Sequence, residues 1–156
     1  MKKLLRAKEG FTLIELMIVI AVIGILAAVL IPYTFRAQDR ARETGVQNAA
    51  RAIQTGLEMY ASNQTKYPWY PTTASDIKDT NTGLAALVSP APKNPFNGLG
   101  YLTDVAEGTN TTFYLGTSTA TVGAGVIVYT TDGNSYTLTL YGARGATLPL
   151  QLTGGR

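Results

Sequence analysis

The chain has 156 residues with 13 basic and 10 acidic side chains, and it contains no cysteine and no histidine. These absences exclude disulfides, thiol nucleophiles, His-based acid–base catalysis and the usual kinds of zinc site. The formal net charge of +3 lies within the first ten residues, where four basic side chains outweigh one acidic side chain. The remainder of the chain is neutral, so we predict no specific nucleic-acid partner.

The first element in chain order is an apolar segment, residues 11–31, whose one charged side chain is Glu15. As an α-helix it is about 31 Å long, enough to cross a hydrocarbon core of about 30 Å. Basic residues precede the segment, but no A-x-A-like site follows it as in a secretory signal peptide. The pattern predicts a single membrane-spanning helix with its N-terminus on the cytoplasmic side.

Glu15 is unusual in this segment, because a carboxylate in lipid costs roughly 2.5–3.5 kcal/mol even on lenient insertion scales. One interpretation is that the side chain reaches the headgroups and interacts favourably with the positive end of the helix dipole. A second interpretation requires a cation at the same depth. Cleavage after Gly10 supplies one, because the new α-amine of Phe11 is protonated at neutral pH.

The hexapeptide GFTLIE, after a short basic leader and before an unbroken apolar run, resembles the cleavage signature of type IV pilins and pseudopilins. The resemblance implies that a prepilin peptidase cuts after Gly10 and methylates Phe11. It also implies that Glu15 pairs with the Phe11 amine of a neighbouring subunit. Gly24 and Pro32 lie where this family loosens its long helix. The partners it implies are an inner-membrane pilus assembly platform, membrane lipid before assembly, and further copies of the chain in a helical homopolymer.

Helical periodicity resumes after Pro32 and predicts an amphipathic half of the same helix, ending near residue 62. Its apolar positions recur at spacings of three and four: Val46, Ala49, Ala50, Ile53, Leu57 and Tyr60. The whole helix, residues 11–62, is expected to be about 78 Å long.

The rest of the chain predicts a loop followed by a β-sheet head. Prolines interrupt residues 63–100, and the period becomes two from residue 101 onward. Strands are predicted at Thr112–Leu115, Val126–Thr131, Ser135–Tyr141 and Leu148–Leu152, with Asp132-Gly133 as a hairpin turn. The predicted class is α+β, with a long helix packed on an antiparallel sheet of three or four strands, as in the type IV pilin fold. The predicted segments are a leader at 1–10, a hydrophobic helix at 11–32, an amphipathic half at 33–62, a loop at 63–100 and a sheet at 101–156.

The sequence offers no constellation typical of an active site, so we expect no enzyme activity and no cofactor. Asp104, Glu107 and Asp132 are the candidates for a calcium site, since carboxylates and backbone carbonyls are the ligands that calcium prefers. Major pseudopilins bind calcium in this half of the chain through a loop richer in acids than this one.

The leading hypothesis is a structural subunit of a type IV pilus, with roles such as adhesion, motility or DNA uptake. The precursor is expected in the inner membrane as a single-pass protein, and the filament on the cell surface. One alternative is a major pseudopilin of a type II secretion or competence system, because the segments GLAALVSP and NPFNGLGY resemble the corresponding region of pseudopilins. The alternative of another class is a monomeric membrane-anchored binding domain.

Overall fold

Helix α1 (Leu13–Gln64) is the longest element and continues through 52 residues in the computed structural model. It begins and ends two residues later than the predicted helix, residues 11–62. The structure describes residues 10–64, 66–68, 73–103, 105–106, 113–116 and 122–155. The chain divides into an N-terminal unit, residues 1–38, and a C-terminal unit, residues 39–156. The boundary between the two units therefore falls inside α1.

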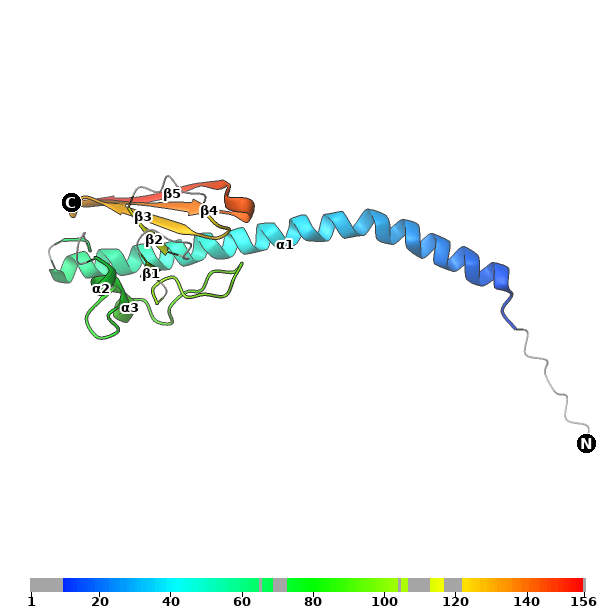
Figure 1. Cartoon of the computed structure of the whole chain (residues 1–156), viewed down its shortest axis with the longest axis horizontal. Coiled ribbons are helices and arrows are strands. Elements are labelled where there is room, and N and C mark those ends of the chain that lie inside the picture. Colours follow the sequence, from blue (N-terminus) through cyan, green and yellow to red (C-terminus); the bar gives the residue numbers. More distant parts are fainter. Residues whose placement is uncertain are drawn as a thin grey trace, which may run out of the picture. The chain divides into compact units, whose positions relative to one another are not determined.

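The C-terminal unit contains a five-stranded sheet in the order β1-β2-β3-β4-β5 (Figure 1). The strands are β1 (Val105–Ala106), β2 (Phe113–Leu115), β3 (Ile127–Thr131), β4 (Ser135–Tyr141) and β5 (Thr147–Gly155). β3, β4 and β5 pair in antiparallel fashion, which confirms the predicted α+β class and its three-stranded antiparallel sheet. β1 and β2 extend the sheet by parallel pairing. β2 lies within the strand predicted at Thr112–Leu115. The sequence did not predict β1 or the parallel pairing, because a strand of two residues is too short to show an alternating pattern.

The β3–β4 hairpin forms at the predicted Asp132-Gly133 pair. Gly133 has a φ of 88°, a conformation that glycine adopts without the steric cost that other residues meet. The Asp132 carboxylate accepts hydrogen bonds from the backbone N–H of Ser135 at 2.6 Å and of Asn134 at 2.9 Å. The turn is therefore held by its own acidic side chain.

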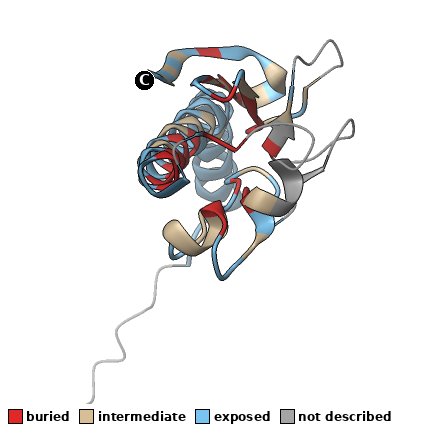
Figure 2. Cartoon of the chain, turned by 90° about the vertical axis from the view of Figure 1, so that its left-hand side faces the viewer, coloured by how far each residue is buried: buried red, intermediate tan, exposed pale blue. Residues whose placement is uncertain are grey.

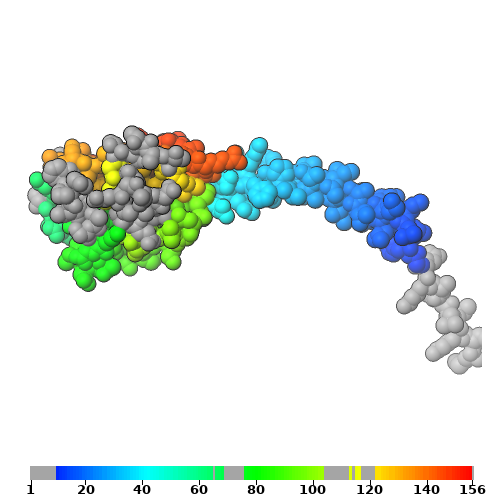
Figure 3. Space-filling model, viewed as in Figure 1, coloured from blue at the N-terminus to red at the C-terminus, as the bar shows by residue number. Residues whose placement is uncertain are grey.

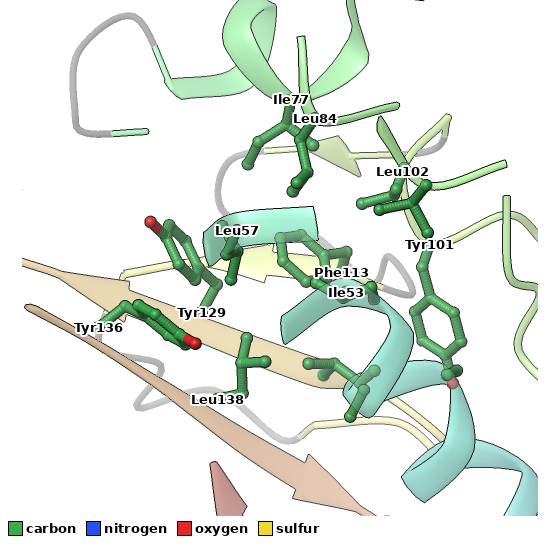
Figure 4. Close-up of a cluster of buried hydrophobic side chains, with 14 of the residues drawn as sticks. Ile53, Leu57, Ile77, Leu84, Tyr101, Leu102, Phe113, Tyr129, Tyr136 and Leu138 are labelled. Carbon is green, nitrogen blue, oxygen red and sulfur yellow. The ribbon is translucent and has the colours of Figure 1, made fainter. Parts of the chain in front are cut away.

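The core of the C-terminal unit lies between α1 and the sheet, as the buried residues in Figure 2 show. Ile53 and Leu57 of α1 face Tyr129 and Leu138 of the sheet (Figure 4), and all four are at most 1% exposed. The predicted apolar face is thus the buried face. The other large buried side chains include Ile77, Leu84, Tyr101, Leu102, Phe113, Ile127, Tyr136 and Leu140.

Two short helices and a turn of 3-10 helix complete the C-terminal unit: α2 (Thr73–Lys78), α3 (Leu84–Leu87) and η1 (Ala143–Gly145). α3 packs closely on α1, because a Cβ placed at Gly56 would lie 2.2 Å from Val88 and 3.0 Å from Leu84. Glycine is therefore needed at this position of α1, where its low helix propensity alone would disfavour it. The sequence predicted α2 only as part of a loop.

Candidate functional site

The N-terminal turn of α1 forms a capping box from Thr12 and Glu15. One oxygen of the Glu15 carboxylate accepts hydrogen bonds from the Thr12 backbone N–H and from its hydroxyl, both at 2.9 Å. The Thr12 hydroxyl oxygen in turn accepts from the Glu15 backbone N–H at 3.3 Å. A Thr followed three residues later by Glu satisfies two backbone donors that a helix start otherwise leaves unpaired.

The capping box answers part of the question that Glu15 raised in the sequence. Within a single chain the carboxylate has a partner, and it lies at the end of α1 where a negative charge is favoured. We missed this role for Thr12 in the sequence, although the signal T-x-x-E before an apolar run is present in TLIE. Only one of the two carboxylate oxygens takes part in the capping bonds.

The predicted cleavage point lies immediately before this capping box. Gly10 is exposed and has no atom of another segment within 4 Å of where its Cβ would stand. Phe11 is 87% exposed. Cleavage at Gly10, methylation of Phe11 and pairing of the Phe11 amine with Glu15 remain predictions.

The large apolar side chains of the N-terminal unit are exposed from Phe11 to Phe35, on the segment coloured blue in Figure 3. Ile14, Ile25 and Val29 are each 67% or 68% exposed. The most apolar part of α1 is not buried within the chain, and α1 is long and apolar enough to cross a membrane. Burying one such side chain contributes about 1.5–3 kcal/mol. The unit therefore exposes a large apolar surface that lipid or other helices could cover.

α1 continues as a helix through both predicted loosening positions, Gly24 and Pro32. A Cβ at Gly24 would meet no atom of another segment within 4 Å. Pro32 has no N–H to donate to the carbonyl of residue 28, and near it the Thr34 hydroxyl donates to the Ile31 carbonyl at 2.8 Å. Loosening of the helix at Gly24 and Pro32 remains a prediction for the assembled state.

Two further carboxylates connect α1 to other elements of the C-terminal unit, Glu58 to the sheet and Glu43 to η1. Glu58 accepts hydrogen bonds from the hydroxyls of Tyr67 at 2.9 Å and of Tyr136 at 2.8 Å. Glu43 accepts from the backbone N–H of Ala143 at 3.1 Å. No sequence pattern indicated these pairings, since Tyr136 lies 78 positions from Glu58 and Ala143 lies 100 positions from Glu43.

The calcium candidates do not form a cluster in the part of the chain that the structure describes. The Asp132 carboxylate is occupied by the hydrogen bonds of its own turn, and the backbone N–H groups of Ser135 and Asn134 lower its pKa. Asp104 and Glu107 lie outside the described residues. Among the described residues, no three acidic side chains come together in a way that could hold a metal ion.

Comparison with known proteins gives matches in the N-terminal segment and beyond it. A family model described as "Prokaryotic N-terminal methylation motif" matches residues 5–31. The chain is 38% identical over 102 residues to type II secretion system core protein G of Pseudomonas aeruginosa, covering 62% of this chain and 64% of that protein. It is 33% identical over 106 residues to the protein of the same name from Vibrio cholerae, covering 65% of this chain and 64% of that protein.

The type IV major pilin protein PilA of Myxococcus xanthus is also similar, with 43% identity over 59 residues. That match covers 38% of this chain and 27% of the pilin. The matches to the secretion proteins cover between 52% and 64% of the length of those relatives. No solved structure matches the chain.

Proposed function

We propose that this chain, which belongs to the family of type IV pilins and type II secretion pseudopilins, is a structural subunit of a helical filament built around α1. The observation that carries the proposal is the exposed apolar surface of residues 13–35, whose large side chains are between 48% and 82% exposed in the single chain. Before assembly, lipid covers this surface. In the filament, the same surface of other copies replaces the lipid.

The comparisons favour a pseudopilus of a type II secretion system over a surface pilus. The match to core protein G extends over 102 residues, which is nearly twice the 52-residue length of α1. It therefore includes sequence beyond the helix. Sequence patterns alone had placed the surface pilus first, so the relatives reverse that order.

A surface pilus is the second candidate, and the similarity to a major pilin supports it. That match has the higher identity, 43%, but its 59 residues barely exceed the length of α1. A methylated N-terminus and an apolar helix are common to both filaments. The N-terminal segment alone cannot separate the two candidates.

Assembly in this proposal includes an exchange of partners at Glu15. In the precursor the carboxylate is engaged by Thr12 of its own chain. In the filament it pairs with the amine of Phe11 of a neighbouring copy. Only one axial offset between two α1 helices brings these charges together, so the pair also sets the register of the filament.

The proposed course of maturation begins with a single-pass precursor in the inner membrane. A prepilin peptidase removes residues 1–10 and methylates Phe11, and an assembly platform in the same membrane adds the subunit to the filament. The role of the chain in this scheme is structural and not catalytic, and it requires no cofactor.

Mass spectrometry of the protein in its native host tests the proposal, with the cell envelope and sheared extracellular material analysed separately. N-methylated Phe11 confined to the envelope is the result expected for a pseudopilin. The same terminus in abundant extracellular filaments supports the surface pilus instead. An intact leader on all of the membrane-bound protein contradicts both candidates.

A further inference from the structure

The face of the sheet that points away from α1 carries hydroxyl and amide groups together with the apolar Val128, and no charged side chain. β3, β4 and β5 have 5, 7 and 9 residues, and none of these residues is charged, although the chain has 23 charged side chains among its 156 residues (13 basic and 10 acidic). Tyr136 and Leu138 of β4 are buried toward α1. Because side chains alternate across a strand, Thr137 and Thr139 point to the opposite face.

The polar side chains on this face form rows across the strands. Thr130 of β3, Thr137 of β4 and Thr153 of β5 are in register with one another. In the adjacent row, Thr139 lies between Gln151 of β5 and Val128 of β3. Neighbouring strands lie about 4.8 Å apart, so the rows offer hydrogen-bonding groups at regular spacing. We call the four threonines and Gln151 the hydroxyl face.

All five side chains of the hydroxyl face are at least partly exposed to solvent. Gln151 and Thr153 on the edge strand β5 are exposed, and Thr130, Thr137 and Thr139 are partly exposed. Each hydroxyl offers a donor and acceptor lone pairs, and the Gln151 amide offers both kinds of group as well. The face can therefore donate and accept at all three positions of the first row and at two of the three positions of the second, where Val128 is apolar and 4% exposed.

We propose that the hydroxyl face binds a neutral polysaccharide. Such a polymer also carries donors and acceptors at regular intervals and has no charge to pair, so it matches both the rows and the absence of charge. An anionic polymer would require Lys or Arg, and the three strands have neither. Protein interfaces depend on Trp, Tyr and Arg anchors. Next to the hydroxyl face, β4 provides only Tyr141, which is half-buried.

Affinity for one copy is expected to be low, because water competes for each hydroxyl group. Many copies displayed together bind more strongly, since every contact after the first is made at high effective concentration. A dense display on a vesicle provides this effect without any filament. Capture of such vesicles therefore does not depend on the proposed filament.

The experiment measures capture of proteoliposomes on insoluble polysaccharides. The full-length chain is reconstituted at high density in fluorescent phosphatidylcholine vesicles, which avoids sugar-based detergents that would compete. The neutral probes are cellulose and chitin, cross-linked alginate is the anionic probe, and protein-free vesicles are the blank. We expect capture on at least one neutral probe at no less than ten times the blank. We also expect this capture to stay unchanged when NaCl is raised from about 0.1 M to about 0.5 M, because no ion pair is involved.

The triple variant Thr137→Val, Thr139→Val, Thr153→Val removes three hydroxyls but keeps the branched shape of the side chains. We expect it to lower capture at least tenfold. Thr55→Val is the matched control, because it removes a hydroxyl from the exposed side of α1, and we expect its capture to equal that of the wild type. Thr153→Lys on the exposed edge strand is a second variant in case the triple variant does not fold. It places a charge on the hydroxyl face and should lower capture at least threefold.

Three results would overturn the proposal. The first is that the wild type is not captured above the blank on either neutral polysaccharide. The second is that capture by folded triple variant, or by Thr153→Lys, equals that of the wild type. The third is that capture occurs on alginate alone and is lost at high salt.

Discussion

The two halves of α1 place the same kind of side chain in opposite environments. Ile25 in the N-terminal unit is 68% exposed, whereas Ile53 in the C-terminal unit is fully buried. The C-terminal half is covered by a sheet and short helices of its own chain, so it completes its packing as a monomer. The N-terminal half exposes its apolar residues and requires lipid or other copies. One helix thus has a C-terminal half that is packed within its own chain and an N-terminal half that is not.

The largest expected effect is on filament assembly through the exposed N-terminal half of α1, and it is tested by replacing Glu15. We expect Glu15→Val to insert into the membrane normally and to lose at least tenfold in filament yield. The physical reason is that removing one partner of a buried ion pair costs about 3–5 kcal/mol. The measurement is the amount of sedimentable filament relative to total membrane protein.

Glu15→Gln is the matched control, because glutamine keeps the capping bonds to Thr12 but has no charge. If the ion pair matters, Gln is as defective as Val. Filaments that form at the normal rate with Gln but not with Val would show that the cap, and not the charge, is what assembly requires.

The second effect compares two isoleucines on the same helix. We expect Ile53→Ala to lower the free energy of unfolding of the C-terminal unit by about 2–5 kcal/mol, because it leaves a cavity in the core. Ile25→Ala should change it by less than about 0.5 kcal/mol, since an exposed side chain loses no packing. Urea unfolding of the full chain in detergent, followed by tyrosine fluorescence, measures both. Equal effects of the two substitutions would contradict the division of α1 into two halves.

A smaller effect is expected from the carboxylate that ties α1 to the sheet. Glu58→Ala removes the carboxylate that accepts from the hydroxyls of Tyr67 and Tyr136, and we expect a loss of about 1–3 kcal/mol in stability. Thr55→Ala is the control on the same stretch of helix, because its hydroxyl bonds only to a carbonyl of its own helix. Thermal unfolding of both variants measures the difference, and a loss no larger than that of the control would show that the carboxylate adds nothing.

Alkaline pH should lower the free energy of unfolding of the C-terminal unit, because its buried tyrosines ionise more readily in the unfolded chain. Burial raises the pKa of Tyr101, Tyr129 and Tyr136 well above the ordinary value of 10.0, and for Tyr136 the adjacent Glu58 adds to the effect. Each such group keeps its full stabilising contribution below the unfolded pKa near 10 and loses it as the pH rises toward the folded pKa. The loss is about 1.4 kcal/mol per pH unit for each tyrosine that ionises only when unfolded.

The alkaline effect is measured by urea unfolding at a series of pH values, together with tyrosinate absorbance. Tyr101→Phe removes one of the buried titrating groups and should make the slope above pH 10 shallower. Stability that does not fall between pH 10 and 12 would contradict the burial of these hydroxyl groups.

The smallest effect is expected from chelation. We expect EDTA to leave the unfolding temperature of the C-terminal unit unchanged within about 1 °C, because the Asp132 carboxylate already has its hydrogen-bond donors within the turn. Added calcium serves as the converse test. A calcium-dependent rise of several degrees would indicate a metal site that includes residues outside the described ones.

The sequence by itself determined the features that depend on local pattern. The apolar run around Glu15, the periodic face from Val46 to Tyr60 and the turn at Asp132-Gly133 could each be predicted, because periodicity and turn chemistry act over a few residues. The GFTLIE signature belongs to the same class, and so does the capping box of Thr12, which was present in the sequence but not recognised.

Only the tertiary structure decided the contacts between distant segments. The bond from Tyr136 to Glu58, the approach of Val88 to Gly56 and the parallel pairing of β1 with β2 depend on how the chain folds back on itself. The rows of the hydroxyl face are likewise set by the register of three strands. Local propensity cannot specify such pairings, because their energy arises only when segments separated by tens of residues meet in the folded state.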